Sequence, residues 1–216
     1  MELVEIDTRH AYDRIRAQII TLELAPGTLI NEQALCESLN MGSVPVREAL
    51  KLLAHDELIV ITPRHGLYVA DISVPELEQL SEVRLTLEPL CAGLAAQRAT
   101  PDDLTVLEAL RAEQAGTASS DSRRLLEVDH KFHQAIVRAS KNKYLFGILE
   151  NLFGLSQRLW YLALPRLDSL PTAVAEHLQL VESIKNQDAE TARKIMHDHV
   201  KEFYDRVRSV LSDSAK

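Results

Sequence analysis

The chain has 216 residues, of which 46% are hydrophobic, 5% aromatic and 26% charged, enough for one large domain or two small ones. The net charge of −8 argues against a generally basic nucleic-acid binder. Transmembrane and signal-peptide stretches are absent. The widely spaced Cys36 and Cys91 lack metal-type spacing and lie in apolar helical patterns, so we expect buried free thiols and a cytoplasmic location.

The first predicted element is a helix over residues 11–22. Thr8 is a plausible N-cap, and Tyr12, Ile15, Ile19 and Leu22 recur at helical spacing. A turn follows at residues 25–27, where proline and glycine adjoin.

Residues 31–69 predict a winged helix. Asn31 is a good N-cap for a short helix that ends near Leu39, and residues 40–42 form a corner. Pro45 lies just inside a second helix, whose predicted inner face is Val46, Ala49, Leu50, Leu52 and Leu53. Residues 58–61 and 67–69 predict a strand pair around a turn. Such folds place the second helix in the major groove of DNA.

Residues 71–76 are the expected domain boundary, because Ser73 and Glu76 have the spacing of a capping box. Helices are predicted over residues 75–99, 101–115, 122–139, 143–164, 169–186 and 189–211. Pro89 should kink the first of them, and its predicted inward residues include Leu77, Leu80, Val83, Leu87 and Leu90. The predicted fold class is mainly α: a winged helix-turn-helix domain over 1–72 and a bundle of six or seven helices over 73–216.

Three histidines and one carboxylate fall on inward faces of this predicted bundle. Asp129 and His133 lie four residues apart on one helix, and His177 and His199 lie on two others. A buried histidine is more often a hydrogen-bonded core residue than a ligand. A divalent ion would nevertheless satisfy all four groups at once, and zinc, nickel, manganese and iron all suit these donors. His197 falls on a more polar face, whereas periodicity does not dismiss His130.

The N-terminal motifs resemble the DNA-binding domain of the GntR family of bacterial transcription regulators. The likeness rests on residues 26–32, on the run Pro45-Val46-Arg47-Glu48-Ala49-Leu50, and on Arg64-His65-Gly66. It implies DNA contacts from the second helix, the wing and one residue of the first helix. The implied residues are Gln33, Ser43, Val44, Arg47, Lys51, Arg64, His65 and Gly66.

This sequence departs from the family pattern before Pro45. Where the family usually has Ser-Arg-Thr, the chain has Gly42, Ser43 and Val44. An arginine pairs bidentately with guanine and a serine does not, at a cost of roughly 1–3 kcal/mol of discrimination. Glu57 also stands where a glycine is usual. Residues 1–70 hold six basic and ten acidic side chains, so DNA binding would depend on a small positive face and on salt.

The C-terminal half resembles the effector-binding and dimerisation domain of the FadR-like branch of that family. The motifs are residues 84–88, 129–133, 176–177 and His199. The resemblance implies that Asp129, His133, His177 and His199 hold a metal ion beside a cavity for a small organic acid. It also implies that Arg84 faces this cavity, although an ion pair with Glu88 one turn away is an equal alternative.

The sequence therefore predicts a ligand-responsive transcription repressor that binds a palindromic double-stranded operator as a homodimer, away from membranes. Two alternatives remain: a winged-helix interaction module with weakened DNA recognition, and a metalloenzyme that uses the histidine cluster. Against an enzyme, no separate general base or nucleophile stands beside the four ligands.

Overall fold

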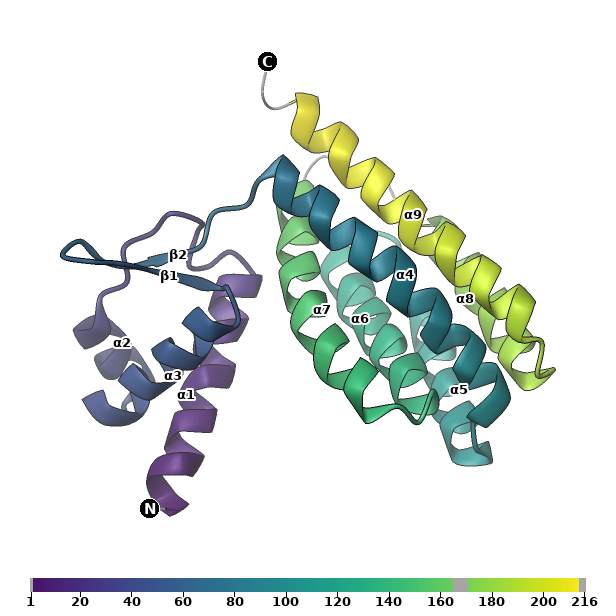
Figure 1. Cartoon of the computed structure of the whole chain (residues 1–216), viewed down its shortest axis with the longest axis horizontal. Coiled ribbons are helices and arrows are strands. Elements are labelled where there is room, and N and C mark those ends of the chain that lie inside the picture. The colour runs from purple at the N-terminus through teal and green to yellow at the C-terminus, as the bar shows by residue number, and fades with distance from the viewer. Residues whose placement is uncertain (1, 165–170, 214–216) are drawn as a thin grey trace. The chain divides into compact units, whose positions relative to one another are not determined.

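The computed structural model describes residues 2–164 and 171–213 and divides into two compact units, residues 1–72 and 73–216 (Figure 1). The first is a small helical unit with a two-stranded wing, and the described part of the second is entirely helical. The predicted fold class is therefore confirmed. Among the described residues, no helix combines the length and apolarity that a membrane span requires.

Helix α1 (Glu2–Ile20) packs against α3 (Ser43–His55) and buries Ile15 and Ile19 completely. The predicted start at Thr8 is wrong, because Thr8 lies inside α1. Residues 2–7 contain no glycine or proline, so nothing in them stops a helix from extending toward the N-terminus.

The helix-turn-helix corner forms as the sequence predicts. Asn31 caps α2 (Glu32–Leu39) by accepting the Ala34 N–H at 3.0 Å, and Asn40 ends it in the left-handed conformation. Helix α3 buries Val46, Ala49, Leu50 and Leu53. Leu52 was expected on this face but is 48% exposed, because a step of about 100° per residue turns it toward the outer side.

The wing pairs β1 (Ile59–Thr62) with β2 (Gly66–Val69) in antiparallel register. Leu29 bridges to Tyr68 on the other side of β2, which ties the wing to the segment before α2. Glu57 and Arg64 have φ values of 61° and 68°. Both are therefore non-glycine residues in left-handed conformations.

The second unit contains six helices in its described ranges. They are α4 (Val74–Arg98), α5 (Pro101–Gly116), α6 (Ser122–Ala139), α7 (Lys143–Ala163), α8 (Pro171–Lys185) and α9 (Ala189–Asp213). Side chains cap most of them at the N-terminus: those of Ser73, Thr100, Asp121 and Asn142. The predicted stop of α7 at Pro165 and start of α8 at residues 169–170 lie outside the described residues.

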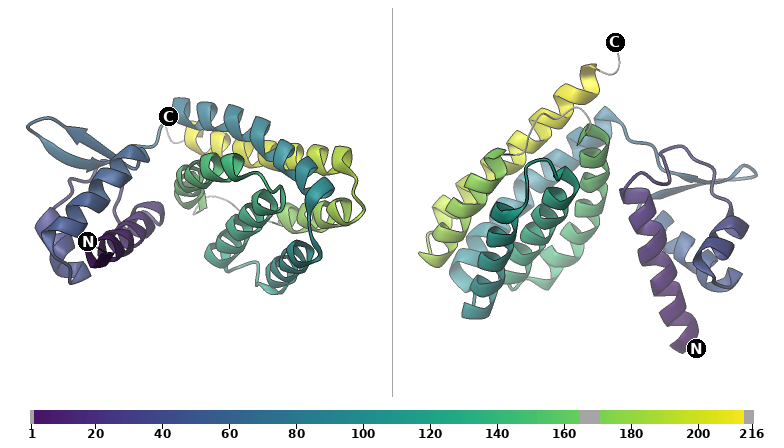
Figure 2. Two further views of the ribbon diagram at one scale, coloured as in Figure 1. Left: turned by 60° about the horizontal axis from the view of Figure 1, so that its bottom comes forward. Right: turned by 180° about the vertical axis from the view of Figure 1, so that it is seen from behind.

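Helices α4 and α9 lie side by side along much of their length (Figure 1), and α6 and α7 pack against α4 from another side (Figure 2). A Cβ on Gly93 would lie 2.5 Å from Nε of Arg193, so α4 and α9 approach closely at this glycine. Pro89 lies inside α4, and the helix continues on both sides of it.

The inward face of α4 is more polar than the sequence predicts. Val83 and Leu90 were expected inside but are 41% and 38% exposed. Arg84, Glu88 and Cys91 are buried instead. Leu77 and Leu80 are buried as predicted. The apolar pattern missed the two charged side chains, which are buried because they form an ion pair inside the bundle.

Candidate metal centre and nucleic-acid interface

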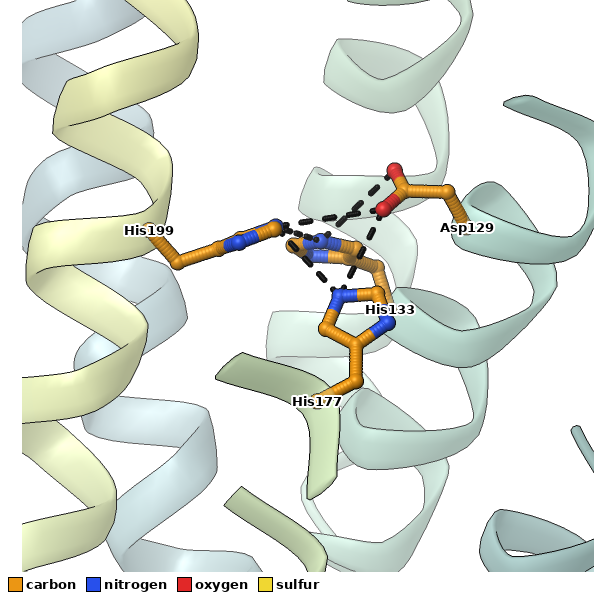
Figure 3. Close-up of side chains that lie close together, drawn as sticks. All are labelled: Asp129, His133, His177 and His199. Carbon is orange, nitrogen blue, oxygen red and sulfur yellow. Dashed lines mark hydrogen bonds and ion pairs between the residues drawn. The ribbon is translucent and has the colours of Figure 1, made fainter. Parts of the chain in front are cut away.

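Asp129, His133, His177 and His199 converge at the centre of the helical unit (Figure 3). Asp129 and His133 come from consecutive turns of α6, whereas His177 comes from α8 and His199 from α9. One potential ligand atom from each residue lies within 4.8 Å of all the others. The structure thus gathers the four residues that the sequence singled out.

The three imidazoles meet through the same ring nitrogen. Nε2 of His199 lies 3.0 Å from Nε2 of His133 and 3.4 Å from Nε2 of His177. Oxygens of Asp129 lie 3.4 Å, 3.8 Å and 3.9 Å from Nε2 of His177, His133 and His199. All three histidines are buried, and the Asp129 side chain is 18% exposed.

Each histidine uses its other nitrogen for a hydrogen bond to an oxygen. His177 Nδ1–H donates to Oε1 of Gln114 on α5 at 2.7 Å. His199 Nδ1–H donates to Glu176 on α8 at 2.7 Å, and His133 Nδ1–H donates to Glu88 on α4. Because these oxygens are acceptors, the proton stays on Nδ1 and the Nε2 lone pairs point toward a common centre.

Helical periodicity could not have identified these three outer partners. Gln114 was not singled out, because it lies on a fourth helix and a lone glutamine carries no metal-type spacing. Glu88 and Glu176 stood inside the motifs that carried the family resemblance, but without a predicted contact to a histidine.

The donor set fits a divalent metal ion. Three converging lone pairs repel one another unless a cation or protons lie between them. Metal–nitrogen bonds of about 2.0–2.1 Å place neighbouring donors about 3.0–3.4 Å apart, and the Nε2 separations of 3.0 and 3.4 Å match this range.

The surroundings shift the pKa values of His177 and His199 in opposite directions. Burial lowers the pKa of His177 well below its ordinary value, and the nearby His199 and His133 lower it further. Burial also lowers the pKa of His199, but the hydrogen bond to Glu176 and the charge of Asp129 outweigh it and raise that pKa. His177 is thus held neutral, the form that binds a metal.

Arg84 joins this centre through Glu88. The Arg84 guanidinium donates to Glu88, which also accepts the His133 Nδ1–H. A second nitrogen of the guanidinium lies 3.5 Å from the Tyr204 hydroxyl. Burial raises the pKa of Glu88, but the charge of Arg84 and the hydrogen bonds from His133 and Arg84 outweigh it and bring that pKa to about 2. The ion pair that the sequence left as an alternative is therefore formed, and Glu88 stays ionised.

A small cavity of about 20 Å³ is lined by two of the four residues, Asp129 and His133. Its walls include Arg84, Asp129, His130, Ser156 and Trp160, so Arg84 reaches both Glu88 and the cavity. Such a volume holds about one water molecule.

The two other histidines of this unit take different positions. His130 lines the cavity and forms a T-shaped contact with Phe153, with 5.6 Å between ring centroids. An inward position of His130, which helical periodicity did not exclude, is therefore the one observed. His197 is exposed and lies 3.3 Å from Asp198. Tyr204, seven residues further along the same helix, is buried.

The predicted DNA-contacting residues lie on the surface of the first unit. Ser43, Val44, Arg47 and Lys51 share the exposed side of α3, and Val44 is 59% exposed. Arg64, His65 and Gly66 form the tip of the wing, where Gly66 has φ 111°.

Three of these side chains already have acidic partners. Arg47 Nε lies 3.2 Å from Glu32, and Lys51 Nζ lies 2.8 Å from Glu48. Gln33 donates to Glu37 at 3.0 Å.

Family models match both units. The model described as bacterial regulatory proteins, gntR family, matches residues 7–69, and the FCD domain model matches residues 79–202.

Similar proteins extend along nearly the whole chain. The chain is 26% identical to the HTH-type transcriptional regulator YdhC of Bacillus subtilis (strain 168), covering 94% of this chain and 91% of that protein. It is also 26% identical to the HTH-type transcriptional repressor RspR of Escherichia coli (strain K12), covering 94% and 90%.

A solved structure has the same fold. E. coli McbR/YncC superposes with a TM-score of 0.80 at 23% identity, covering 92% of this chain and 97% of that one. Together with the two family matches, this shows that the chain belongs to the GntR family of bacterial transcription regulators, in its FadR-like branch, with a DNA-binding winged helix followed by an FCD domain.

Proposed function

We propose that this transcription regulator is a metal-containing repressor that binds a palindromic operator as a homodimer and senses a small carboxylic acid. The observation that carries the sensing half is the shared orientation of three imidazoles. Each one is held at Nδ1 by an outer acceptor and presents Nε2 to one point.

Asp129, His133, His177 and His199 would hold the ion. Imidazole and carboxylate donors without a thiolate suit zinc, nickel, manganese or iron. When bound, the ion would supply a positive centre that attracts a carboxylate oxygen. Glu88, Gln114 and Glu176 orient the three rings whatever the ion is.

The effector class follows from the charges around the cavity. The buried Arg84 lines it together with Asp129 and His133, and a carboxylate suits both the guanidinium and a metal ion. Because the cavity holds about 20 Å³, an organic acid would enter only with movement of wall residues such as Trp160. That movement would be the start of the response, and a coupling of about 1–3 kcal/mol is enough for a switch.

The repressor assignment rests on the names of similar proteins. RspR of E. coli is named a transcriptional repressor, and a Bacillus licheniformis relative, 24% identical, is named a gluconate operon repressor. A palindromic operator follows from a two-fold symmetric dimer.

Elemental analysis of the purified full-length protein tests the metal centre. We expect about one divalent ion per chain, which Asp129→Ala and His177→Ala should each remove. His197→Ala is the matched control, because His197 is exposed and lies outside the cluster. A metal content that survives both ligand substitutions would overturn the metal assignment.

Footprinting on an operator selected from random-sequence DNA tests the DNA-binding half. We expect a protected palindrome, and we expect Arg47→Ala to weaken binding by about 5- to 150-fold if one bidentate base contact is lost. Lys185→Ala removes the same charge from the helical unit and should have no effect. Selection that enriches no motif, even at low salt, would favour the winged-helix interaction module.

A further inference from the structure

Arg47 is the only arginine of α3. Base recognition by this helix therefore depends on Arg47 more than it does in relatives that have a second arginine. At the place where the family usually carries that second arginine, this chain has Ser43. The direction in which the Arg47 guanidinium points therefore determines which base or phosphate α3 can recognise.

Glu32 fixes one edge of that guanidinium. Its Oε2 lies 3.2 Å from Arg47 Nε, and it comes from the first turn of α2, directly after the Asn31 cap. Solvent reaches both side chains, which are 58% exposed for Arg47 and 38% exposed for Glu32, so the pair contributes little to folding. An exposed pair that joins the two helices of the motif is better placed to orient the arginine than to stabilise the unit.

The contact leaves the other edge of the guanidinium available. Nε belongs to one side of the fork, whereas bidentate recognition of guanine uses two parallel N–H groups. Among the described residues, Glu32 is the side chain that binds Arg47. Glu48, its neighbour in sequence, pairs with Lys51 instead.

We propose that Glu32 is a positioning residue that holds Arg47 so that its Nη1–Nη2 edge pairs with a guanine in the major groove. The inference rests on the proposed DNA binding of α3. The proposal predicts that removing Glu32 weakens DNA binding. Charge alone predicts the opposite, because an acidic group near DNA repels phosphates and its removal should tighten binding.

The probe is a duplex carrying the palindrome that the wild-type full-length protein enriches from random-sequence DNA. Glu32→Ala should bind this duplex about 2- to 10-fold more weakly, the cost of ordering one freed side chain. It should also discriminate less against replacement of one guanine in each half-site. Glu23→Ala is the control, because it removes the same charge from an exposed loop residue of the same unit.

The decisive measurement repeats Glu32→Ala in an Arg47→Ala background. If Glu32 acts through Arg47, its removal there should no longer weaken binding, whereas a purely structural effect would persist. Thermal melting of each variant checks that the unit still folds.

Glu32→Ala that binds as tightly as wild type, or more weakly by the same factor on every operator variant, would overturn the inference. If Arg47→Ala itself leaves binding unchanged, then it is the proposed DNA-binding surface that fails.

Discussion

At the scale of single residues, His133, His177 and His199 share one hydrogen-bonding pattern. Each imidazole here has one nitrogen bound to an acceptor of another helix and the other turned inward. Any one of them would resemble a satisfied core histidine. The same arrangement of all three is what a metal ion shared at the centre would require.

Gln114 should tune the metal affinity without binding the ion. Gln114→Ala leaves the ligand His177 in place but removes the acceptor of its Nδ1–H. We expect about 10- to 100-fold weaker metal binding, measured by competition with a chromophoric chelator. Gln134→Ala, which removes a half-buried glutamine that donates to Glu150, is the control, and equal affinities for the two variants would contradict the assignment.

Glu57 carries a conformational cost that the family's glycine avoids. It follows α3 in the left-handed conformation, with φ 61°, which costs a non-glycine residue roughly 1–2 kcal/mol. Glu57→Gly should therefore stabilise the first unit by about 1 kcal/mol in urea unfolding. Glu57→Ala removes the same charge but keeps the Cβ, so a gain of equal size in both variants would show that charge and not backbone strain is responsible.

At the scale of elements, capping residues allowed most helix ends to be predicted from the sequence. Thr100 and Asp103 form a reciprocal capping box at the start of α5, and Asn31 caps α2 as expected. Apolar periodicity was less reliable, because Val83 and Leu90 follow it and yet lie outside the core. Caps depend on a few neighbouring residues, whereas burial depends on what the rest of the chain places opposite.

The capping box of α5 should make stability depend on pH. Burial raises the pKa of Asp103, but the bonds from Lys141 and Thr100 outweigh it and lower that pKa below its ordinary value. The folded state thus binds this proton less readily than the unfolded state. The stabilisation is present above about pH 4 and is lost as the pH falls through the folded pKa.

Asp103→Ala should therefore cost about 1 kcal/mol at neutral pH and progressively less below about pH 4, as measured by denaturant unfolding at several pH values. Asp102→Ala, its exposed neighbour in the same turn, should show neither effect. A cost for Asp103→Ala that does not change with pH would exclude the carboxylate as its source.

At the scale of the whole molecule, the chain has a net charge of −8, so the proposed DNA binding depends on a small number of basic side chains. If Arg47 reads a base, the phosphate contacts fall to Lys51 and Arg64 of each protomer. Two protomers then supply four such contacts in the proposed dimer, far fewer than a basic DNA-binding domain presents.

The salt dependence of operator binding should accordingly be shallow. Four phosphate contacts give a slope of about −4 for log K against log salt, and Arg64→Ala should reduce its magnitude by about 2 in the dimer. Titrations by fluorescence anisotropy between low and moderate salt measure both values. A slope twice as steep would mean that cations outside α3 and the wing tip also contact DNA.

The sequence by itself determined the winged helix, the all-helical second unit, and the four residues Asp129, His133, His177 and His199, because local caps, turns and helical spacing encode these features. Only the tertiary structure decided that Gln114, Glu88 and Glu176 hold the imidazoles, that Arg84 pairs inside the bundle, and that Glu32 holds Arg47. Most of these contacts join residues from different helices, often far apart in the chain. No local pattern specifies such contacts, because they depend on which faces the packed helices bring together.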